Sequence, residues 1–552
     1  TCEDAMRRSL LPLAVLTASA SILGAAAPAR QTGSRYEDLV ALFHEWRAFQ
    51  RPTLVGGVPD YTAAAMAAQH RALATYQQRL AAIDPSGWPV PRQVDYHIVR
   101  AEMNGLEFDH RVLRPWANNP AFYVTVFESE SDQPAREGPF AYGAVELWQY
   151  RFPLDRESAG RIAAGLRTIP ALLEQARRNL TGNGRDLWRF GAEKIRAQSA
   201  TLERLLARLT PEDAELRREV ERARAATDAF AAWLEEQAPS KTGPSGVGIA
   251  EYDWYLANVQ LLPYTWRDEV VLMERELARA HAALALEEQR NAGLPELPVV
   301  ASAEEHARRF NDAVTEYMAF LKARDILTIH DDMEPALRAR LGRFSPGPRE
   351  FFAEVDYREP VAMRLHGFHW FDKAWLARGA ASSPMRAVPL LYNIFATRTE
   401  GLATAWEEMM MQAGLFDSRP RARELIYILV AQRAARALGD LRQHANQLTL
   451  EQAAEFACAH TPRGWLRLDG RLVRDEQHLY LQQPGYGTSY LVGKIQLERL
   501  LADRRRQLGA AFTMRRFMDE VVAAGLIPVS LVRWEVMGEL PPDLQAVMAT
   551  PR

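Results

Sequence analysis

Two histidines with metal-ligand spacing are the residues of this sequence that point most directly to chemistry. His366 and His369 lie three residues apart in the segment His-Gly-Phe-His. If that segment is helical, both rings lie on one face and can bind the same metal ion. Glu400 follows in a second predicted helix, and two histidines with one distant carboxylate are a common catalytic zinc set. We therefore predict a zinc site at these three residues. The alternative is a buried polar seam without metal.

Three further acidic side chains lie near these ligands in the sequence and are candidates for proton transfer. Glu407 follows Glu400 by seven residues, which is two helical turns along the same face, and Glu408 is its neighbour. Asp372 comes three residues after His369. A carboxylate within hydrogen-bond reach of the reacting water is a common proton acceptor in hydrolysis. We assign this role to Glu407, Glu408 or Asp372.

A glycine-containing stretch near the C-terminus carries two tyrosines. The sequence Gln-Pro-Gly-Tyr-Gly-Thr-Ser-Tyr spans residues 483–490 and places Tyr486 and Tyr490 four positions apart, at the expected start of a helix. Glycine allows the backbone to approach a neighbour or a ligand closely. A tyrosine hydroxyl here can donate a hydrogen bond to a developing oxyanion, and we assign that role to Tyr490. The alternative is a tightly packed turn in which both tyrosines are structural.

Helices must position these groups, because apolar residues recur at helical spacing along most of the chain. Glycine and proline interrupt the pattern at residues 238–248, which form the clearest linker. We expect a mostly α-helical fold with little β structure, in which residues 341–355 supply one or two strands. The linker divides the chain into an N-terminal helical lobe, residues 30–240, and a C-terminal helical lobe, residues 241–552, which carries the site.

The first residues have the layout of a secretory signal peptide. Arg7 and Arg8 precede an apolar run over residues 10–27, and small residues follow. We place the cleavage after Ala29, so that residues 1–29 comprise a few upstream residues and the leader. The protein is then periplasmic or secreted, with no stable membrane insertion; the alternative is an uncleaved anchor. We expect no lipid anchor, because Cys2 precedes the apolar run.

Composition excludes several classes of protein. The 552 residues include 67 Lys and Arg against 70 Asp and Glu, a net charge of −3, whereas a nucleic-acid-binding domain is usually strongly basic. The chain has two cysteines, of which only Cys458 remains after cleavage, so we expect neither a disulfide scaffold nor a cysteine-rich metal site. The expected partner is a small-molecule or peptide substrate, and not a nucleic acid.

Three stretches resemble the bacterial family called domain of unknown function 885. Residues 248–255 resemble its central Gly-x-x-x-Tyr helix, and residues 399–407 resemble its Glu-Gly-Trp-Ala-x-Tyr-x-Glu helix. Residues 483–494 resemble its Pro-Gly-Gln-x-x-x-Tyr-x-x-Gly helix entry. The resemblance extends from Tyr36 to Met537. It implies a large zincin-like body of many helices, related to metallopeptidases, with two helical lobes around a central cleft.

The sequence departs from this family at the catalytic motif. The family pattern is His-Glu-x-x-Pro-Gly-His, in which the histidines bind metal and the glutamate is the general base. Alignment on Gly367 places Ala362 and Met363 at the His-Glu positions. Phe368 falls where the second histidine is expected, and His369 follows one residue later. The resemblance therefore implies either a rearranged metal site or a site that has lost its metal.

Two functions stay open at this point. In the first, His366, His369 and Glu400 form a rearranged zinc site, and the protein is an exported metal-dependent hydrolase of peptides or small amide or ester substrates. Glu400 is the ligand that matches the family directly. In the second, the protein is a catalytically altered family member that acts as a periplasmic ligand-binding or scaffold protein. We favour the first, because the histidines, several acids and Tyr490 keep the relative places that the family gives them.

Overall fold

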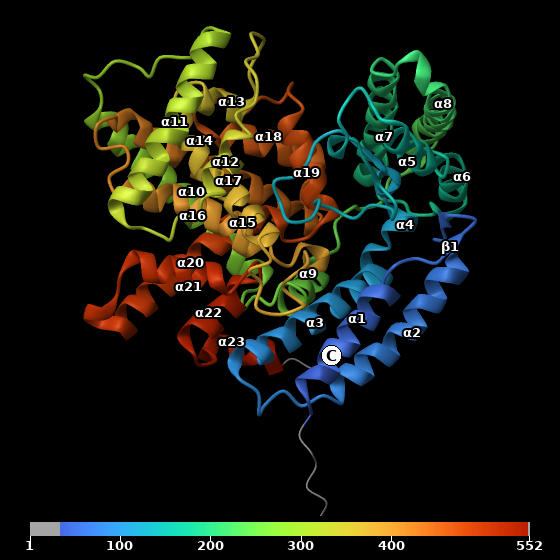
Figure 1. The fold of residues 1–552 in the computed structure, drawn as a ribbon, viewed down its shortest axis with the longest axis horizontal. Helices are drawn as coiled ribbons and strands as arrows, with labels where there is room; N and C mark the ends of the chain where they lie inside the picture. The colour runs from blue at the N-terminus through green and yellow to red at the C-terminus, as the bar shows by residue number, and fades with distance from the viewer. Residues whose placement is uncertain (1–33, 550–552) are drawn as a thin grey trace, which may run out of the picture.

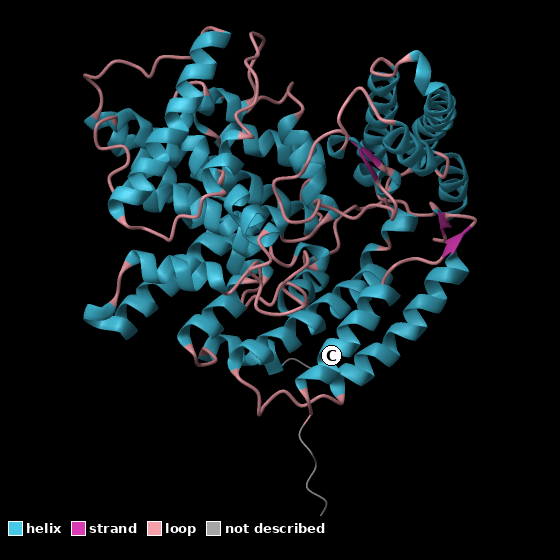
Figure 2. Cartoon of the chain, in the orientation of Figure 1, coloured by secondary structure: helices cyan, strands magenta, loops and turns pink. Residues whose placement is uncertain are grey.

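The computed structural model describes residues 34–549, and helices dominate this part of the chain (Figures 1 and 2). The predicted signal peptide lies outside the described residues. The mostly α-helical fold with little β structure is confirmed. Within the described residues the strands are two short pairs: β1 (Leu54–Val55) with β2 (Val58–Pro59), antiparallel, and β3 (Val126–Phe127) with β4 (Val145–Glu146), parallel. None of the helices between residues 34 and 549 combines the length and the apolar character that crossing a bilayer requires.

Four helices form a lobe with a hydrophobic core of its own, at the upper right of Figure 1. These helices are α5 (Arg156–Leu166), α6 (Ile169–Asn179), α7 (Arg185–Leu206) and α8 (Ala214–Gln237). Each buries one apolar stripe and exposes charged residues on the other side, as amphipathic helices of a small bundle do. A loop that we call the strap, residues 128–143, connects β3 with β4 at the base of this lobe.

The remaining helices share one large core. The N-terminal members are α1 (Tyr36–Phe49), α2 (Ala63–Ala81) and α3 (Val90–Phe108). The others are α9 (Ile249–Asn258), α10 (Trp266–Arg290), α11 (Ala303–Arg324), α12 (Met333–Arg338), α13 (Phe351–Asp356), α14 (Pro360–His366), α15 (Phe368–Ala377), α16 (Ala396–Gln412), α17 (Pro420–His444), α18 (Leu450–His460), α19 (Leu472–Gln482), α20 (Tyr486–Leu508), α21 (Met514–Ala523), α22 (Val529–Met537) and α23 (Pro542–Ala549). The short α4 (Pro115–Asn118) instead packs Trp116 and Ala117 into the core of the four-helix lobe.

The linker predicted at residues 238–248 coincides with the passage from α8 to α9. In space, however, α1 to α3 do not belong to the same core as α5 to α8. Their apolar faces pack into the core of the larger body, which spans residues on both sides of the linker. The chain therefore enters the larger body first, leaves it to form the four-helix lobe, and returns to it at α9.

The prediction of strands within residues 341–355 was wrong. Residues 341–350 have no regular structure, and α13 begins at Phe351. Phe351 and Val355 lie four positions apart on one face of this short helix, and both are fully buried. The aromatic character that suggested a strand is instead part of a helical pattern, in which residues four positions apart lie on the same face.

The α16 and α20 helices are in direct backbone contact. A Cβ atom on Gly401 would lie 2.4 Å from the Cα atom of Gly493, and a Cβ atom on Gly493 would lie 2.0 Å from the carbonyl oxygen of Thr397. Real Cβ atoms do not approach other atoms that closely, so both helices need glycine at the crossing. The consequence is that Glu400 on α16 and the tyrosines at the start of α20 are held at a fixed separation.

We expect Gly493→Ala to lower the free energy of unfolding by about 1–3 kcal/mol, because the added methyl group forces the two backbones apart. Helix propensity alone predicts the opposite sign, a gain of about 0.5–1 kcal/mol. Chemical denaturation measures the difference. The control is Gly160→Ala in α5, where nothing lies within 4 Å of the added methyl group, so that only the propensity gain is expected. A stabilised Gly493→Ala protein would contradict the proposed backbone contact.

Candidate metal centre

The two histidines belong to two short helices that meet at a glycine. His366 is the last residue of α14, Gly367 follows, and His369 lies in the first turn of α15. A Cβ atom on Gly367 would lie 2.9 Å from the carbonyl oxygen of Arg364, so the junction excludes a side chain. The segment is therefore broken between the histidines instead of forming one continuous helix. The two rings are nevertheless neighbours, with centroids 4.9 Å apart and planes at 88°.

Glu400 of α16 completes a group of three possible ligands. Its Oε2 atom lies 3.3 Å from Nε2 of His369 and 3.7 Å from Nε2 of His366. One ligand atom from each of the three residues lies within 4.8 Å of the others. Ligand atoms around a tetrahedral zinc ion are about 3.3 Å apart, because each lies about 2.0–2.1 Å from the metal. The two separations that involve Glu400, at 3.3 and 3.7 Å, are therefore close to what zinc requires.

Hydrogen bonding at Glu400 leaves one oxygen atom for a cation. Oε1 accepts from the hydroxyl of Tyr486 at 2.6 Å and from the Nε2 amide of Gln133 at 3.1 Å. Oε2 is buried and forms no hydrogen bond, although both histidine Nε2 atoms face it. A buried carboxylate oxygen without a donor is unfavourable unless positive charge lies beside it. An unpaired carboxylate oxygen and two imidazole nitrogens are ligand types that zinc accepts.

Glu407 contacts the outer side of His366. Its Oε1 atom lies 3.0 Å from Nδ1 of His366, and both of its oxygens accept hydrogen bonds from Arg433, at 2.7 and 2.8 Å. Nη2 of Arg433 also lies 3.1 Å from this Nδ1 atom. The guanidinium can only donate and the carboxylate can only accept, so the two contacts hold the ring in place without fixing its tautomer. Burial and the Arg433 charge lower the pKa of His366, which favours the neutral form that binds metal. Carboxylate–histidine pairs of this kind orient metal ligands.

The charges around His369 favour a cation. Burial alone would lower the pKa of His369, but the carboxylates of Asp132 and Glu400 outweigh it and raise this pKa to about 9. Conversely, burial would raise the pKa of Glu400, but His369 and His366 lower it to about 2. The negative potential that holds a proton on a buried histidine equally favours a metal ion at the same place.

Two of the predicted proton carriers are instead engaged in buried ion pairs. Both oxygens of Asp372 accept from Arg398, at 3.0 and 3.1 Å, in a pair that is almost completely buried. Glu408 accepts from Arg279 at 2.9 Å and lies 3.2 Å from Nζ of Lys494. Each carboxylate neutralises a buried cation, so neither is free to accept a proton from water. Of the three predicted carriers, Glu407 alone contacts a ligand histidine.

The two tyrosines have different positions at the centre. The hydroxyl of Tyr486 is bonded to Glu400. The ring of Tyr490 lies beside that of His366, with centroids 6.4 Å apart and planes within 11°, and the guanidinium group of Arg436 lies 5.2 Å from the Tyr490 ring. Both His366 and Tyr490 are only partly buried. The open side of the centre is therefore the side where these two rings meet.

The sequence analysis missed the contribution of the strap. Gln133 is 1% exposed, donates to Glu400, lies 3.4 Å from Nε2 of His369 and accepts a 2.6 Å hydrogen bond from the hydroxyl of Thr399. Four residues later in the strap, burial together with the Asp132 charge raises the pKa of the Glu137 carboxyl to about 7. Neither residue lies in a recognisable motif, and no feature of the sequence connects the strap with residues more than two hundred positions away.

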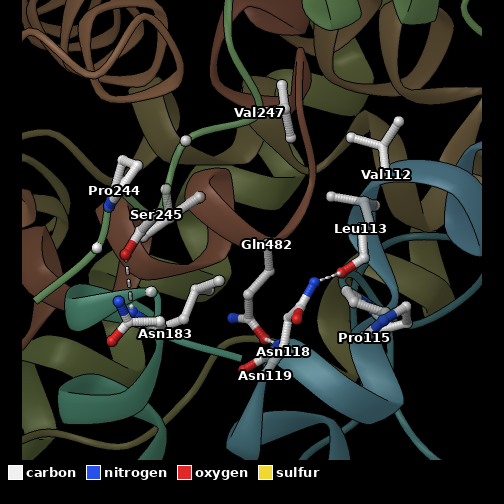
Figure 3. Close-up of a pocket in the computed structure, with 16 residues that line it drawn as sticks. Val112, Leu113, Pro115, Asn118, Asn119, Asn183, Pro244, Ser245, Val247 and Gln482 are labelled. Atoms are coloured by element: carbon white, nitrogen blue, oxygen red, sulfur yellow. Dashed lines mark hydrogen bonds between the residues drawn. The ribbon is translucent and has the colours of Figure 1, made fainter. Parts of the chain in front are cut away.

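A cavity of about 330 Å³ at the junction of the two lobes is separate from this centre (Figure 3). Amide and hydroxyl groups line it, and they already bond one another or the backbone. Asn119 donates to Gln482 at 2.8 Å, Asn118 donates to the carbonyl of Leu113 at 2.8 Å, and Ser245 accepts from the backbone of α7. These polar groups stabilise the junction, and we assign no chemistry to them.

Comparisons with known proteins agree with this fold. A family model described as "Bacterial protein of unknown function (DUF885)" matches residues 51–365 and 369–536. The match is interrupted at residues 366–368, the segment that begins with His366. No curated protein matches the chain.

Two solved structures share the fold. One is described as a lipoprotein of unknown function from Shewanella oneidensis; it has a TM-score of 0.67 at 14% identity, over 92% of this chain and all of that one. The other, from Colwellia psychrerythraea and also described as a lipoprotein, has a TM-score of 0.63 at 14% identity, over 91% of this chain and 97% of that one.

The geometry predicts a structural role for Asp372 that a double-mutant cycle can measure. Asp372→Ala leaves Arg398 as an unpaired buried charge, so we expect a loss of about 3–5 kcal/mol of stability. Combining it with Arg398→Met removes both charges, and the double variant should be more stable than the sum of the single losses predicts. The matched control is the exposed pair of Glu157 and Arg161, where the coupling should stay below about 1 kcal/mol. Additive losses at Asp372 and Arg398 would contradict the buried pair.

Proposed function

The chain belongs to the DUF885 family of bacterial proteins of unknown function, and from that premise we propose that it is an exported, zinc-dependent hydrolase of peptides or small amide or ester substrates. The observation that carries the proposal is the convergence of His366, His369 and Glu400, with one buried Glu400 oxygen left without a hydrogen bond. Two histidines, a carboxylate and an open fourth position are the ligand set of many hydrolytic zinc sites.

When bound, zinc would supply Lewis-acid polarisation of a carbonyl oxygen and a bound water of lowered pKa. The chain's own residues prepare the site for it. Gln133 and Tyr486 fix one oxygen of Glu400, so the other keeps its direction toward the histidines. Glu407 and Arg433 both contact Nδ1 of His366 and hold its ring in place. Partners of this kind orient metal ligands.

Proton transfer at this site needs a carboxylate that is not neutralised by a buried cation. Glu407 remains near the centre, but Arg433 lowers its pKa against the effect of burial, which makes it a weak base. Glu137 in the strap suits the role better. It is partly buried, its Oε2 atom accepts a hydrogen bond from Ser131, and it interacts electrostatically with Glu400. Its pKa is raised to about 7. A general base works best when its pKa is close to the working pH. We therefore include Glu137 in the proposed machinery.

Tyr490 is proposed as the donor to the oxyanion. It lies on the open side of the centre beside His366, and no residue of the described chain accepts a hydrogen bond from its hydroxyl. A fixed donor at the place where negative charge develops lowers the barrier of acyl transfer. The neighbouring Tyr486 cannot serve in this way, because its hydroxyl is already bonded to Glu400.

A second candidate function follows from the altered motif. Ala362 and Met363 stand where the family has the His-Glu pair, and the family match omits residues 366–368. A member that lost its metal would keep the inherited fold and bind a ligand without hydrolysis. Export is common to both candidates: the leader predicts it, and the two solved relatives are described as lipoproteins. A measurement of the metal content distinguishes the zinc hydrolase from the metal-free ligand-binding protein.

We expect the purified protein to contain about one zinc ion per chain, which elemental mass spectrometry measures. His366→Ala, His369→Ala and Glu400→Gln should each reduce the content severalfold, because each removes one of three protein ligands. The matched control is His44→Ala, since His44 is an exposed histidine of α1. Metal content far below one per chain, unchanged in the three variants, would rule out the zinc site and favour the ligand-binding alternative.

Hydrolysis itself is tested by screening the protein against a peptide library and a panel of small esters. Activity should disappear on chelation and return with added zinc. Tyr490→Phe should keep its zinc and lose about 10²-fold in kcat, which is the usual effect of removing one oxyanion donor. If zinc is bound but no substrate of either class is cleaved, the metal centre is structural and the hydrolase assignment fails. Equal kcat for Tyr490→Phe and the unaltered protein would remove Tyr490 from the mechanism.

A further inference from the structure

A second cavity, of about 470 Å³, lies between α3, the strap and a short 3₁₀ turn at Leu391–Asn393. Its lining is mainly apolar and rich in aromatic residues, among them Tyr61, Trp116, Phe122, Phe140 and Tyr255. The volume lies in the range of small-molecule sites, which are apolar cavities with few polar groups. None of the three proposed zinc ligands lines this cavity.

One acidic side chain in this lining lacks a partner. Asp109 lines the cavity, and its carboxylate has neither a hydrogen bond nor an ion pair with any described residue. Burial raises the pKa of this carboxyl to about 7, and no nearby cation opposes the effect. Asp109 is partly exposed where it lines the cavity, so its carboxylate is accessible to a partner from outside the chain. A cationic partner would favour the charged form of this carboxylate.

The two arginines of the lining do not serve as that partner. Arg47 donates to the fully buried carboxylate of Glu102 at 2.7 Å and to the carbonyl of Pro389 at 2.8 Å. Arg136 donates to the carbonyl of Ser129 and lies over the ring of Phe127, with its guanidinium carbon 4.1 Å from the centroid. Asp109 is therefore the charged group of the cavity wall that still lacks a partner.

The backbone around Asp109 is unusual on both sides of the cavity. Asp109 begins a π-helical turn, Asp109–Leu113, at the end of α3. Across the cavity, Tyr392 and Asn393 both have left-handed backbone conformations, with φ of 57° and 48°. Such conformations cost about 1–2 kcal/mol each for residues other than glycine, and they and π turns concentrate at functional sites. Two separate segments with unusual backbone conformations therefore line the same cavity.

The left-handed turn at Tyr392 places the ring of this residue against α3. A Cβ atom on Gly105 would lie 2.3 Å from the ring of Tyr392, so α3 carries glycine where that ring packs. Gly105 is one helical turn before Asp109, on the same face of α3. The Asn393 amide donates to Gln483 at 2.9 Å, which holds the turn in place. The conformation therefore brings an aromatic ring to the face of α3 that carries Asp109.

We propose that this cavity binds a small organic cation, an amine with an apolar or aromatic body, and that Asp109 is its counter-ion. A carboxylate in an aromatic-lined cavity matches an ammonium group by charge, and aromatic rings add cation–π attraction. The apolar wall matches the rest of such a ligand. This inference does not depend on the proposed hydrolase activity, because it concerns different residues and is tested by binding alone.

The test uses the full-length exported protein and three probes of similar shape: 2-phenylethylamine, 2-phenylethanol and 3-phenylpropanoate. Calorimetry or ligand-observed NMR should show that the amine binds at least tenfold more tightly than the neutral alcohol, and that the carboxylate does not bind. Asp109→Asn should abolish this preference, because it removes the charge with little change in shape. Glu107→Gln is the matched control: Glu107 lies two residues earlier in α3, contacts His70 and does not line the cavity.

Equal binding of the amine and the alcohol to the unaltered protein would overturn the proposal, and so would an unchanged preference in Asp109→Asn. The comparison of the three probes with unaltered protein needs no variant, so it remains decisive even if a variant fails to fold. Zinc content measured on the same samples keeps the two proposals distinguishable. Asp109→Asn should keep the metal, whereas His369→Ala should lose metal and still bind the amine.

Discussion

The contact between the backbones of α16 and α20 is the constraint on which the candidate metal centre depends. Gly401 and Gly493 allow the two helices to touch, and any side chain at either position would separate them. Glu400 immediately precedes Gly401, and Tyr486 lies two turns before Gly493, so the same contact sets the 2.6 Å hydrogen bond between this carboxylate and this hydroxyl. The position of the Glu400 carboxylate relative to the Tyr486 hydroxyl thus depends on the absence of two Cβ atoms at the crossing.

Buried arginines determine which of the acids near the centre can take part in chemistry. Arg398 pairs with Asp372 and Arg433 with Glu407, and all four side chains are almost completely buried. In each pair the arginine compensates the charge of a buried carboxylate, which would otherwise be unfavourable. A carboxylate that is paired in this way is a poor proton acceptor. Glu400 differs, because its partners are a hydroxyl and an amide. It therefore keeps a full negative charge that only the histidines, or a cation between them, can compensate.

The sequence was informative where local pattern decides structure and uninformative where distant segments meet. Helical periodicity predicted the fold class and the passage near residue 240, and spacing predicted that His366 and His369 come together. The break at Gly367 escaped prediction because the spacing of the two histidines is the same in one continuous helix as in two helices that meet between them. The wrong strand assignment shows the same limit, since apolar residues such as Phe351 and Val355, four positions apart, fit either period until burial is known. The pairing of Asp372 with Arg398 left no local signal.

Gln133 is the clearest case of a residue that only the fold identifies, and it explains why the four-helix lobe matters to the site. The side chain of Gln198 on α7 accepts hydrogen bonds from the backbone of Thr125 and Val126, just before the strap begins. Further along, the strap places Gln133 on Glu400, and the backbone amide of Gly138 donates to Gln483 at 2.7 Å. The strap thus runs from the lobe past the metal centre to the wall of the second cavity. The lobe contributes none of the three proposed zinc ligands, so its contribution to the site is to hold the strap that covers it.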